Sequence, residues 1–141
     1  NPLVLIAPLS HRLANKRSQS LKAVEHDAFI LREHGSGTRL ACDDHFKEHV
    51  FSPHIRMEVG SSETIKQAVA SGLGVGIVAE MAVRETLDDD LVVRPAGHLF
   101  GQNVARIAFK RHAYLRNFVY DFAAMLSEKL DKPMILSALE S

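Results

Sequence analysis

Two short polar segments of the chain contain the residue types that bind small anions. They are EHGSGTR at 33–39 and GSSE at 60–63. Glycine lets the backbone approach an anion closely, and serine and threonine hydroxyl groups donate hydrogen bonds to it. We therefore expect a site for a small anion, or for a molecule that carries a carboxylate. The six candidate binding residues are Ser36, Gly37, Thr38, Gly60, Ser61 and Ser62.

Each polar segment follows a predicted strand and opens a predicted helix. In parallel α/β sheets, ligands bind beyond the carboxyl ends of the strands, where helices begin. A helix start offers free backbone N–H groups and the positive end of the helix dipole. Arg39 adds positive charge if its side chain points to the same place. The competing interpretation is that these residues only cap the two helices, which is an ordinary role of Ser, Thr and Gly.

The segment HFKEH at 45–49 carries a different kind of chemistry. His45 and His49 are four residues apart and share a helix face, and H-x-x-E-H matches the inverted zinc-protease signature. A catalytic zinc needs a third protein ligand and an open position. The nearby residues that could supply a ligand are His54, Asp44 and Cys42. We favour an exposed polar helix face, and so expect no metal and no catalytic residue.

Cys42 is the only cysteine, so an intramolecular disulfide is impossible, which suits a reducing cytoplasm. Because Asp43 and Asp44 are adjacent, they should raise the pKa of the thiol and disfavour a nucleophile. GLGVGIV at 72–78 resembles a dinucleotide fingerprint, but its glycines end a helix and enter a strand, the reverse of the required order. No cofactor is therefore expected.

The composition indicates about one domain and excludes a strong overall electrostatic attraction to nucleic acid. Among 141 residues, 46% are apolar, and seventeen basic side chains balance seventeen acidic ones. The basic stretches at 11–17 and 110–116 are short, so we interpret them as solvated loops. No apolar run approaches the length of a membrane span.

The apolar pattern predicts alternating strands and helices, hence βαβ units and a mostly parallel sheet. The strand over 3–7 is expected to be buried on both faces, as in a parallel sheet. The other expected strands cover 28–31, 54–59, 75–79, 91–93 and 104–109. The expected helices are a short one over 21–25 capped by Ser20, then 38–49, one ending at Gly72, 79–86 and 113–130.

Three of these helices have a predicted buried face. The residues expected to point inward are Leu40, Phe46 and Val50, then Ile65, Val69 and Leu73, then Leu115, Phe118, Val119, Phe122 and Leu126. Pro133 is expected to end the last helix, and the apolar tail PMILSAL has no predicted place.

Several longer segments, in this order, resemble the effector-binding domain of LysR-type transcriptional regulators over roughly 3–130. They are LVLIAPLSHRLA, EHGSGTR and VGSSETIKQAVASGLGVGIVAEMAV. The C-terminal half, from AEMAV to HLFGQNVARIAFKRHAYLRNFVYDF, is most similar to the cysteine-biosynthesis (CysB) subgroup. EHGSGTR instead resembles the regulators of carbon-fixation genes.

The resemblance implies an α/β, periplasmic-binding-protein-like fold, in which two subdomains with parallel-rich sheets are joined by two crossover strands. By this likeness, 1–8 is the first crossover strand and 9–101 is the complete second subdomain. Residues 102–141 are then the return crossover strand and the C-terminal helix of the first subdomain. The rest of the first subdomain and an N-terminal winged helix-turn-helix are expected outside this sequence.

The resemblance also implies a non-enzymatic, cytoplasmic sensor without membrane contact. The effector is expected in the cleft between the subdomains, which the six candidate residues face. The expected effectors are sulfate-like anions or acetylserine. A homodimer or homotetramer is expected, with DNA bound only through the winged helix-turn-helix. The alternatives are a carbon-fixation-type regulator with a different metabolite, a solute-binding module of transport, and a zinc hydrolase that uses His45, Glu48 and His49.

Overall fold

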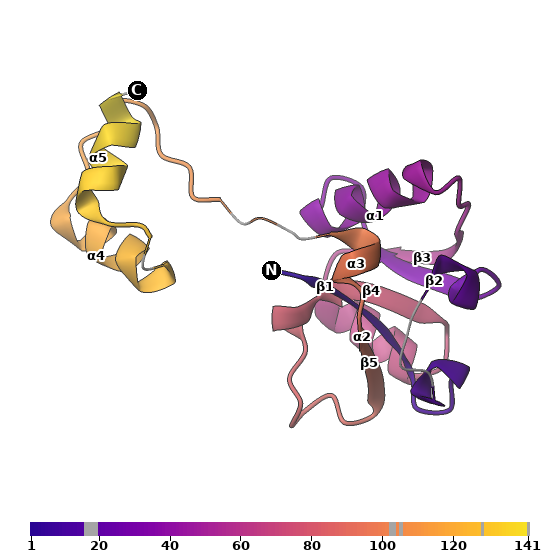
Figure 1. Ribbon diagram of the computed structural model, residues 1–141. Coiled ribbons are helices and arrows are strands. Elements are labelled where there is room, and N and C mark those ends of the chain that lie inside the picture. The colour runs from indigo at the N-terminus through magenta and orange to yellow at the C-terminus, as the bar shows by residue number, and fades with distance from the viewer. Residues whose placement is uncertain (16–19, 102–103, 105, 128, 141) are drawn as a thin grey trace. The chain divides into compact units, whose positions relative to one another are not determined.

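The computed structural model describes residues 1–15, 20–101, 104, 106–127 and 129–140 (Figure 1). The chain forms two compact units, Asn1–Ala105 and Arg106–Ser141. Within the described residues, every helix is too short or too polar to cross a bilayer.

A five-stranded sheet forms the first unit, in the order β3-β2-β4-β1-β5. Its strands are β1 (Leu3–Pro8), β2 (Ala28–Arg32), β3 (His54–Val59), β4 (Val75–Ala79) and β5 (Leu91–Pro95). β2 pairs in parallel with β3 and β4, whereas β1 pairs antiparallel with β4 and β5. Four strands therefore run in one direction, which confirms the mostly parallel sheet, and β1 alone is reversed.

Two helices connect the parallel strands in the predicted βαβ units. α1 (Gly37–Glu48) joins β2 to β3, and α2 (Ser62–Ala70) joins β3 to β4. Since β3 and β4 lie on opposite sides of β2, crossovers of one hand place the two helices on opposite faces of the sheet. Figure 1 shows this layering. β1 is buried on both faces because helices cover both, not because its neighbours are parallel.

The core therefore has two layers, one on each face of the sheet. On the α1 face, Phe29 packs edge-on against Phe46, with ring centroids 5.8 Å apart. On the α2 face, Ile65 and Val69 pack against β1 and β4. Successive residues of β1 alternate between the layers, as strand geometry requires: Leu3, Leu5 and Ala7 face α1, and Val4 and Ile6 face α2.

The predicted bounds of α1 are close to the observed ones, but its predicted buried face is largely wrong. Phe46 is buried, whereas Leu40 is 62% exposed and Val50 is 94% exposed. Arg39 and Cys42 occupy the inner face with Phe46 instead. Val50 lies past the helix end, in a left-handed turn at φ 51° that directs it to solvent.

The predicted face of α2 is confirmed for Ile65 and Val69, which are fully buried. Leu73 is 39% exposed, because α2 ends at Ala70 and the chain turns at Gly72, where φ is +80°. Gly76 in β4 lies under this helix: a Cβ atom there would be 2.5 Å from Cγ2 of Ile65. A glycine is therefore required for this close approach.

The short elements agree only in part with the prediction. Ser20 caps the 3-10 helix η2 (Leu21–Val24) as expected, accepting the N–H of Ala23. The helix predicted over 79–86 is only the single turn η3 (Glu80–Ala82). Two further short helices, η1 (Arg12–Asn15) and α3 (Gly97–Phe100), were not expected. Part of the predicted basic loop, residues 16–19, lies outside the described residues.

The second unit contains two packed helices, α4 (Asn117–Leu126) and α5 (Lys132–Glu140). Its core is Tyr120, Ala123, Ile135 and Leu139. The apolar tail thus forms a helix that packs on α4. Pro133 is in the first turn of that helix, where its missing N–H costs nothing.

Two predictions for this unit are wrong. Phe118, Phe122 and Leu126, expected to be buried, are more than half exposed, because α5 covers the Tyr120 face of α4 instead. The strand predicted over 104–109 is not present at 104 or 106–109, and residue 105 lies outside the described residues. No described strand pairs with this segment, and a strand is stable only with a neighbour.

Candidate functional site

The structure brings the starts of the two polar segments side by side. β2 and β3 are parallel neighbours, so their carboxyl ends lie at the same edge of the sheet. Arg32 pairs with Val59 at the ends of the two strands, and the N–H of Glu33 donates to the carbonyl of Val59 at 3.1 Å. At this edge, the segments that follow β2 and β3 each lead into a helix, as the sequence pattern predicts.

Both helices are capped by a serine of these segments. Oγ of Ser36 accepts the N–H of Arg39 at 3.0 Å, and Oγ of Ser61 accepts the N–H of Thr64 at 3.1 Å. The capping interpretation is therefore correct for these two residues. It does not exclude ligand binding. Oγ of Ser61 also lies 2.9 Å from Oγ1 of Thr64, and when the threonine hydroxyl donates this bond, the serine proton stays available for a ligand.

The candidate residues differ in their access to solvent. Gly37, Gly60 and Ser61 are exposed, and Ser36 and Ser62 are partly exposed. Thr38 is only 7% exposed, so its side chain belongs to the packed face of α1. Open space lies in front of Gly60, where an added Cβ would meet no atom within 4 Å. A ligand at this edge can thus approach the backbone at Gly60.

Arg39 reaches this edge, where its Nη1 donates to the carbonyl of Arg32 at 2.9 Å, but it is not a free positive charge. It is 4% exposed and donates from Nε to Asp43 at 2.9 Å and from Nη1 to Glu58 at 2.8 Å. Burial alone would lower the pKa of Arg39, but the hydrogen bonds to the two carboxylates outweigh this and raise it. Arg39 therefore ties α1 to β3, a role that sequence reasoning missed.

A second ion pair at this edge joins sequence neighbours. The guanidinium of Arg32 donates two hydrogen bonds to Glu33, at 2.8 and 2.9 Å. These bonds lower the pKa of Glu33 to about 2, so the carboxylate stays ionised at neutral pH. Because the pair balances its own charge, the helix starts and the hydroxyl groups are the main attractive features for an anion.

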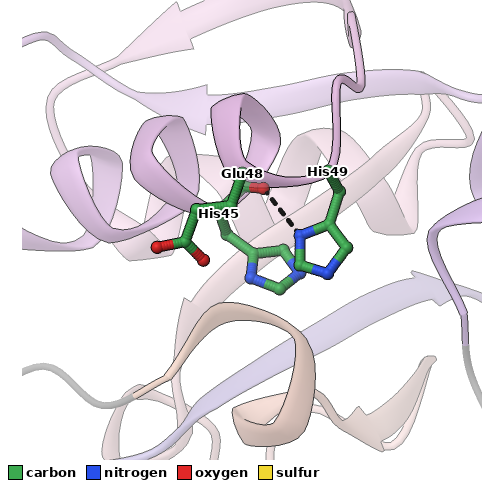
Figure 2. A group of neighbouring side chains, drawn as sticks. All are labelled: His45, Glu48 and His49. Atoms are coloured by element: carbon green, nitrogen blue, oxygen red, sulfur yellow. Dashed lines mark hydrogen bonds between the residues drawn. The ribbon is translucent and has the colours of Figure 1, made fainter.

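The residues of the zinc-like motif also come together. His45, Glu48 and His49 each place a potential ligand atom within 4.8 Å of the other two (Figure 2). The imidazole rings of His45 and His49 are 4.0 Å apart, centroid to centroid. Burial lowers the pKa of His45, and the nearby His49 lowers it further. This cluster is on the last turn of α1, at the opposite end of that helix from Ser36.

Cys42 is a buried thiol. Its side chain is in the core between α1 and the sheet. Burial raises the pKa of Cys42 to about 12, and the charge of Asp43 contributes in the same direction. The thiolate is therefore scarce at neutral pH, and Cys42 is not an activated nucleophile.

The buried Lys66 is at the centre of a polar cluster that the sequence did not predict. It is 5% exposed, and Nζ lies 2.8 Å from Glu63 and 3.0 Å from Asp88. It also donates to the carbonyl of Ala82 at 2.9 Å. The cluster borders a cavity of about 380 Å³. Through Lys66, it connects α2 to Ala82 of η3 and to Asp88. Glu63, three residues before Lys66, was the available sequence signal.

Comparison with known proteins identifies the family. The family model described as the LysR substrate binding domain matches residues 1–131. The chain belongs to this family. Its α/β fold is accordingly the periplasmic-binding-protein-like fold predicted from the sequence.

Curated relatives of this LysR-type chain are transcriptional regulators. The HTH-type transcriptional regulator CysB of Burkholderia cenocepacia is 35% identical over 135 residues, which cover 96% of this chain and 43% of the relative. A RuBisCO operon transcriptional regulator of Acidithiobacillus ferrooxidans is 42% identical over 87 residues, covering 62% of this chain and 28% of the relative. The chain thus spans less than half the length of these relatives.

Two solved structures of regulator domains are similar over nearly the whole chain. The cofactor-binding domain of the Cbl transcriptional regulator has a TM-score of 0.83 and 25% identity, covering 99% of this chain and 62% of that chain. The Synechocystis PCC6803 CcmR regulatory domain in complex with 2-PG has a TM-score of 0.71 and 32% identity, covering 94% and 64%. Among the curated relatives, CysB and the RuBisCO operon regulator represent the two subgroups suggested by the sequence.

Proposed function

We propose that this chain is the effector-sensing part of a LysR-type transcriptional regulator and binds a small anionic metabolite at the edge formed by Ser36–Thr38 and Gly60–Ser62. The observation that carries this proposal is that two helices begin just past the carboxyl ends of neighbouring parallel strands, at one edge of the sheet. Each start contributes backbone N–H groups, a serine hydroxyl and a glycine.

This chemistry favours an anion over a cation or a neutral ligand. The helix dipoles direct partial positive charge at the edge, and the N–H and hydroxyl groups are hydrogen-bond donors. The two nearby arginines, Arg32 and Arg39, are already paired with carboxylates, so the site does not depend on a free guanidinium. Such a site suits a compact anion such as sulfate, or the carboxylate group of a molecule such as acetylserine.

The ligand of a carbon-fixation-type regulator is the second candidate. The similarity to the RuBisCO operon regulator and to the CcmR domain solved with 2-PG supports this alternative, whereas the similarity to CysB over 96% of the chain supports a sulfur-related ligand. The relatives named above are regulators, which favours sensing over the transport function considered from the sequence.

In the whole protein, we propose that effector binding changes the conformation of a homodimer or homotetramer whose winged helix-turn-helix domains bind DNA. A ligand shifts such an equilibrium only by its difference in affinity for the two conformations. The proposed role of this chain is therefore binding without catalysis.

Isothermal titration calorimetry of the chain with sulfate, acetylserine and 2-PG tests the proposal. We expect saturable binding with one site per chain for at least one of these anions. An uncharged analogue, the amide of O-acetylserine with a blocked amino group, should not bind. Heat signals that do not saturate for any of the three anions would count against the proposed site.

A further inference from the structure

We propose that His45, Glu48 and His49 form a binding site for Zn²⁺ on the last turn of α1, separate from the anion site and without a catalytic role. One potential ligand atom from each side chain lies within 4.8 Å of the other two. Figure 2 shows the three side chains gathered on one side of the helix end. Two imidazoles and one carboxylate are a donor set that zinc uses in proteins. This inference departs from the expectation, drawn from the sequence, that the motif is only a polar helix face.

The hydrogen bond of His49 prepares its ring for a metal. Nδ1 of His49 lies 3.0 Å from the backbone carbonyl of His45, drawn as the dashed line in Figure 2. A carbonyl only accepts, so Nδ1 carries a proton, and in the neutral ring Nε2 then keeps its lone pair. Metal-bound histidines commonly have this arrangement, in which a backbone carbonyl fixes the tautomer and the orientation of the ring.

His45 has a polar atom that the fold does not satisfy. Its Nε2 is buried and has no hydrogen-bond partner among the described residues. The ring is held by an edge-on contact with Phe100 of α3, at 5.3 Å between centroids. An unsatisfied buried nitrogen is unusual in native proteins, and an ion is one of the partners that satisfy such an atom. A bound metal ion offers the ring of His45 such a partner.

The remaining two side chains can close around an ion. Donor atoms at about 2.0–2.1 Å from a tetrahedral zinc lie roughly 3.4 Å from one another, so the separations in the observed cluster must shorten by at most roughly 1.4 Å. Glu48 and His49 are exposed, so rotation about their side-chain bonds allows this contraction. Three protein ligands leave one coordination position for water.

Titration of the purified chain with Zn²⁺ tests the inference. We expect one saturable site per chain and a rise in Tm when Zn²⁺ is added. His49→Ala should weaken this site at least about tenfold, because even changes behind the ligands of metal sites cost that much. Glu48→Gln should weaken it in the same direction. Both residues are exposed at the helix end, so both variants are expected to fold, which circular dichroism checks.

His26→Ala is the matched control, because the chain has eight histidines and any of them can bind zinc weakly. His26 is 86% exposed and lies outside the cluster. The control should bind Zn²⁺ as the wild type does. The inference is overturned if the wild type shows no saturable site, or if His49→Ala and Glu48→Gln bind Zn²⁺ as tightly as His26→Ala.

Discussion

The backbone N–H of Glu33 donates a hydrogen bond of 3.1 Å to the carbonyl of Val59. This bond extends the pairing of β2 and β3 by one residue beyond the strands, just before the segment that follows each strand leads into a helix. Because of it, the starts of α1 and α2 lie at one edge although they are separated by 25 residues of sequence (Ser62 minus Gly37). The proposed anion site depends on this register.

The serine caps should contribute to stability independently of any ligand. Ser36→Ala removes the acceptor for the N–H of Arg39, and we expect a loss of about 1 kcal/mol in the free energy of unfolding. Urea denaturation measures this loss. Ser52→Ala, at an exposed position outside the helices, should stay within about 0.5 kcal/mol of the wild type. Equal stability of both variants would show that the observed cap is not formed in solution.

Two glycines should respond oppositely to alanine. In Gly76→Ala the new methyl group would lie 2.5 Å from Ile65 and 3.1 Å from Ile6 and Val69, so we expect a loss of about 1–3 kcal/mol from overpacking. Gly60→Ala meets no atom within 4 Å and should leave thermal stability nearly unchanged. Thermal unfolding of the two variants tests this contrast, and a stable Gly76→Ala protein would contradict the packing of α2 on β4.

Arg39 should be more important for folding than its charge alone suggests. Arg39→Met leaves Asp43 and Glu58 without their shared partner, and we expect a loss of about 1–3 kcal/mol. Lys47→Met, an exposed position on the same helix, is the control and should have little effect. The comparison is made by urea denaturation at neutral pH, and similar values for both variants would count against the buried ion pairs.

The fold should lose stability in acid partly through Asp88. Burial raises the pKa of this carboxyl, but hydrogen bonds from the Arg84 N–H and from Lys66 outweigh burial and lower it below its ordinary value. A group with a lowered folded pKa stabilises the fold above its unfolded pKa, near 4, and loses that contribution as pH falls through the folded pKa. Asp88→Asn should therefore be less stable than the wild type at neutral pH, with a difference that shrinks in acid.

Asp89→Asn is the control for this pH dependence, because Asp89 is exposed and adjacent. Because its side chain is exposed, we expect the Asp89→Asn protein to stay within about 0.5 kcal/mol of the wild type. The measurement is the free energy of unfolding between pH 7 and pH 3. A difference between the wild type and Asp88→Asn that is the same at every pH would exclude the proposed role of the ionised carboxylate.

The candidate site could be predicted because its determinants are local. Ser36 and Ser61 each stand between an apolar strand pattern and a helical pattern, and parallel strands bring such boundaries to one edge. The sequence could not reveal that Arg39 is buried, since one of its partners, Glu58, comes from a strand 19 residues later. Apolar periodicity assigned Leu40 to the core, but the ion pairs of Arg39 and the packing of Phe46 determine which face of α1 is inside.

The second unit shows a different limit of prediction. An apolar stripe on α4 was visible in the sequence, but which of its faces is buried depends on α5. The tail that forms α5 has no strong helical stripe of its own and contains Pro133 in its first turn, and a proline is compatible with both a helix end and a helix start. Periodicity alone therefore could not place Tyr120 inside and Phe118 outside.

The most direct test of the anion site is the affinity of Ser61→Asp for the anion that the wild type binds most tightly. Aspartate caps a helix as well as serine and suits the positive end of the dipole, so the free energy of unfolding should stay within about 0.5 kcal/mol of the wild type. Its negative charge stands where the anion is proposed to bind, and we expect the dissociation constant to rise at least about tenfold, roughly the effect of 1.4 kcal/mol. Unchanged affinity in a folded Ser61→Asp protein would contradict the site at the starts of α1 and α2.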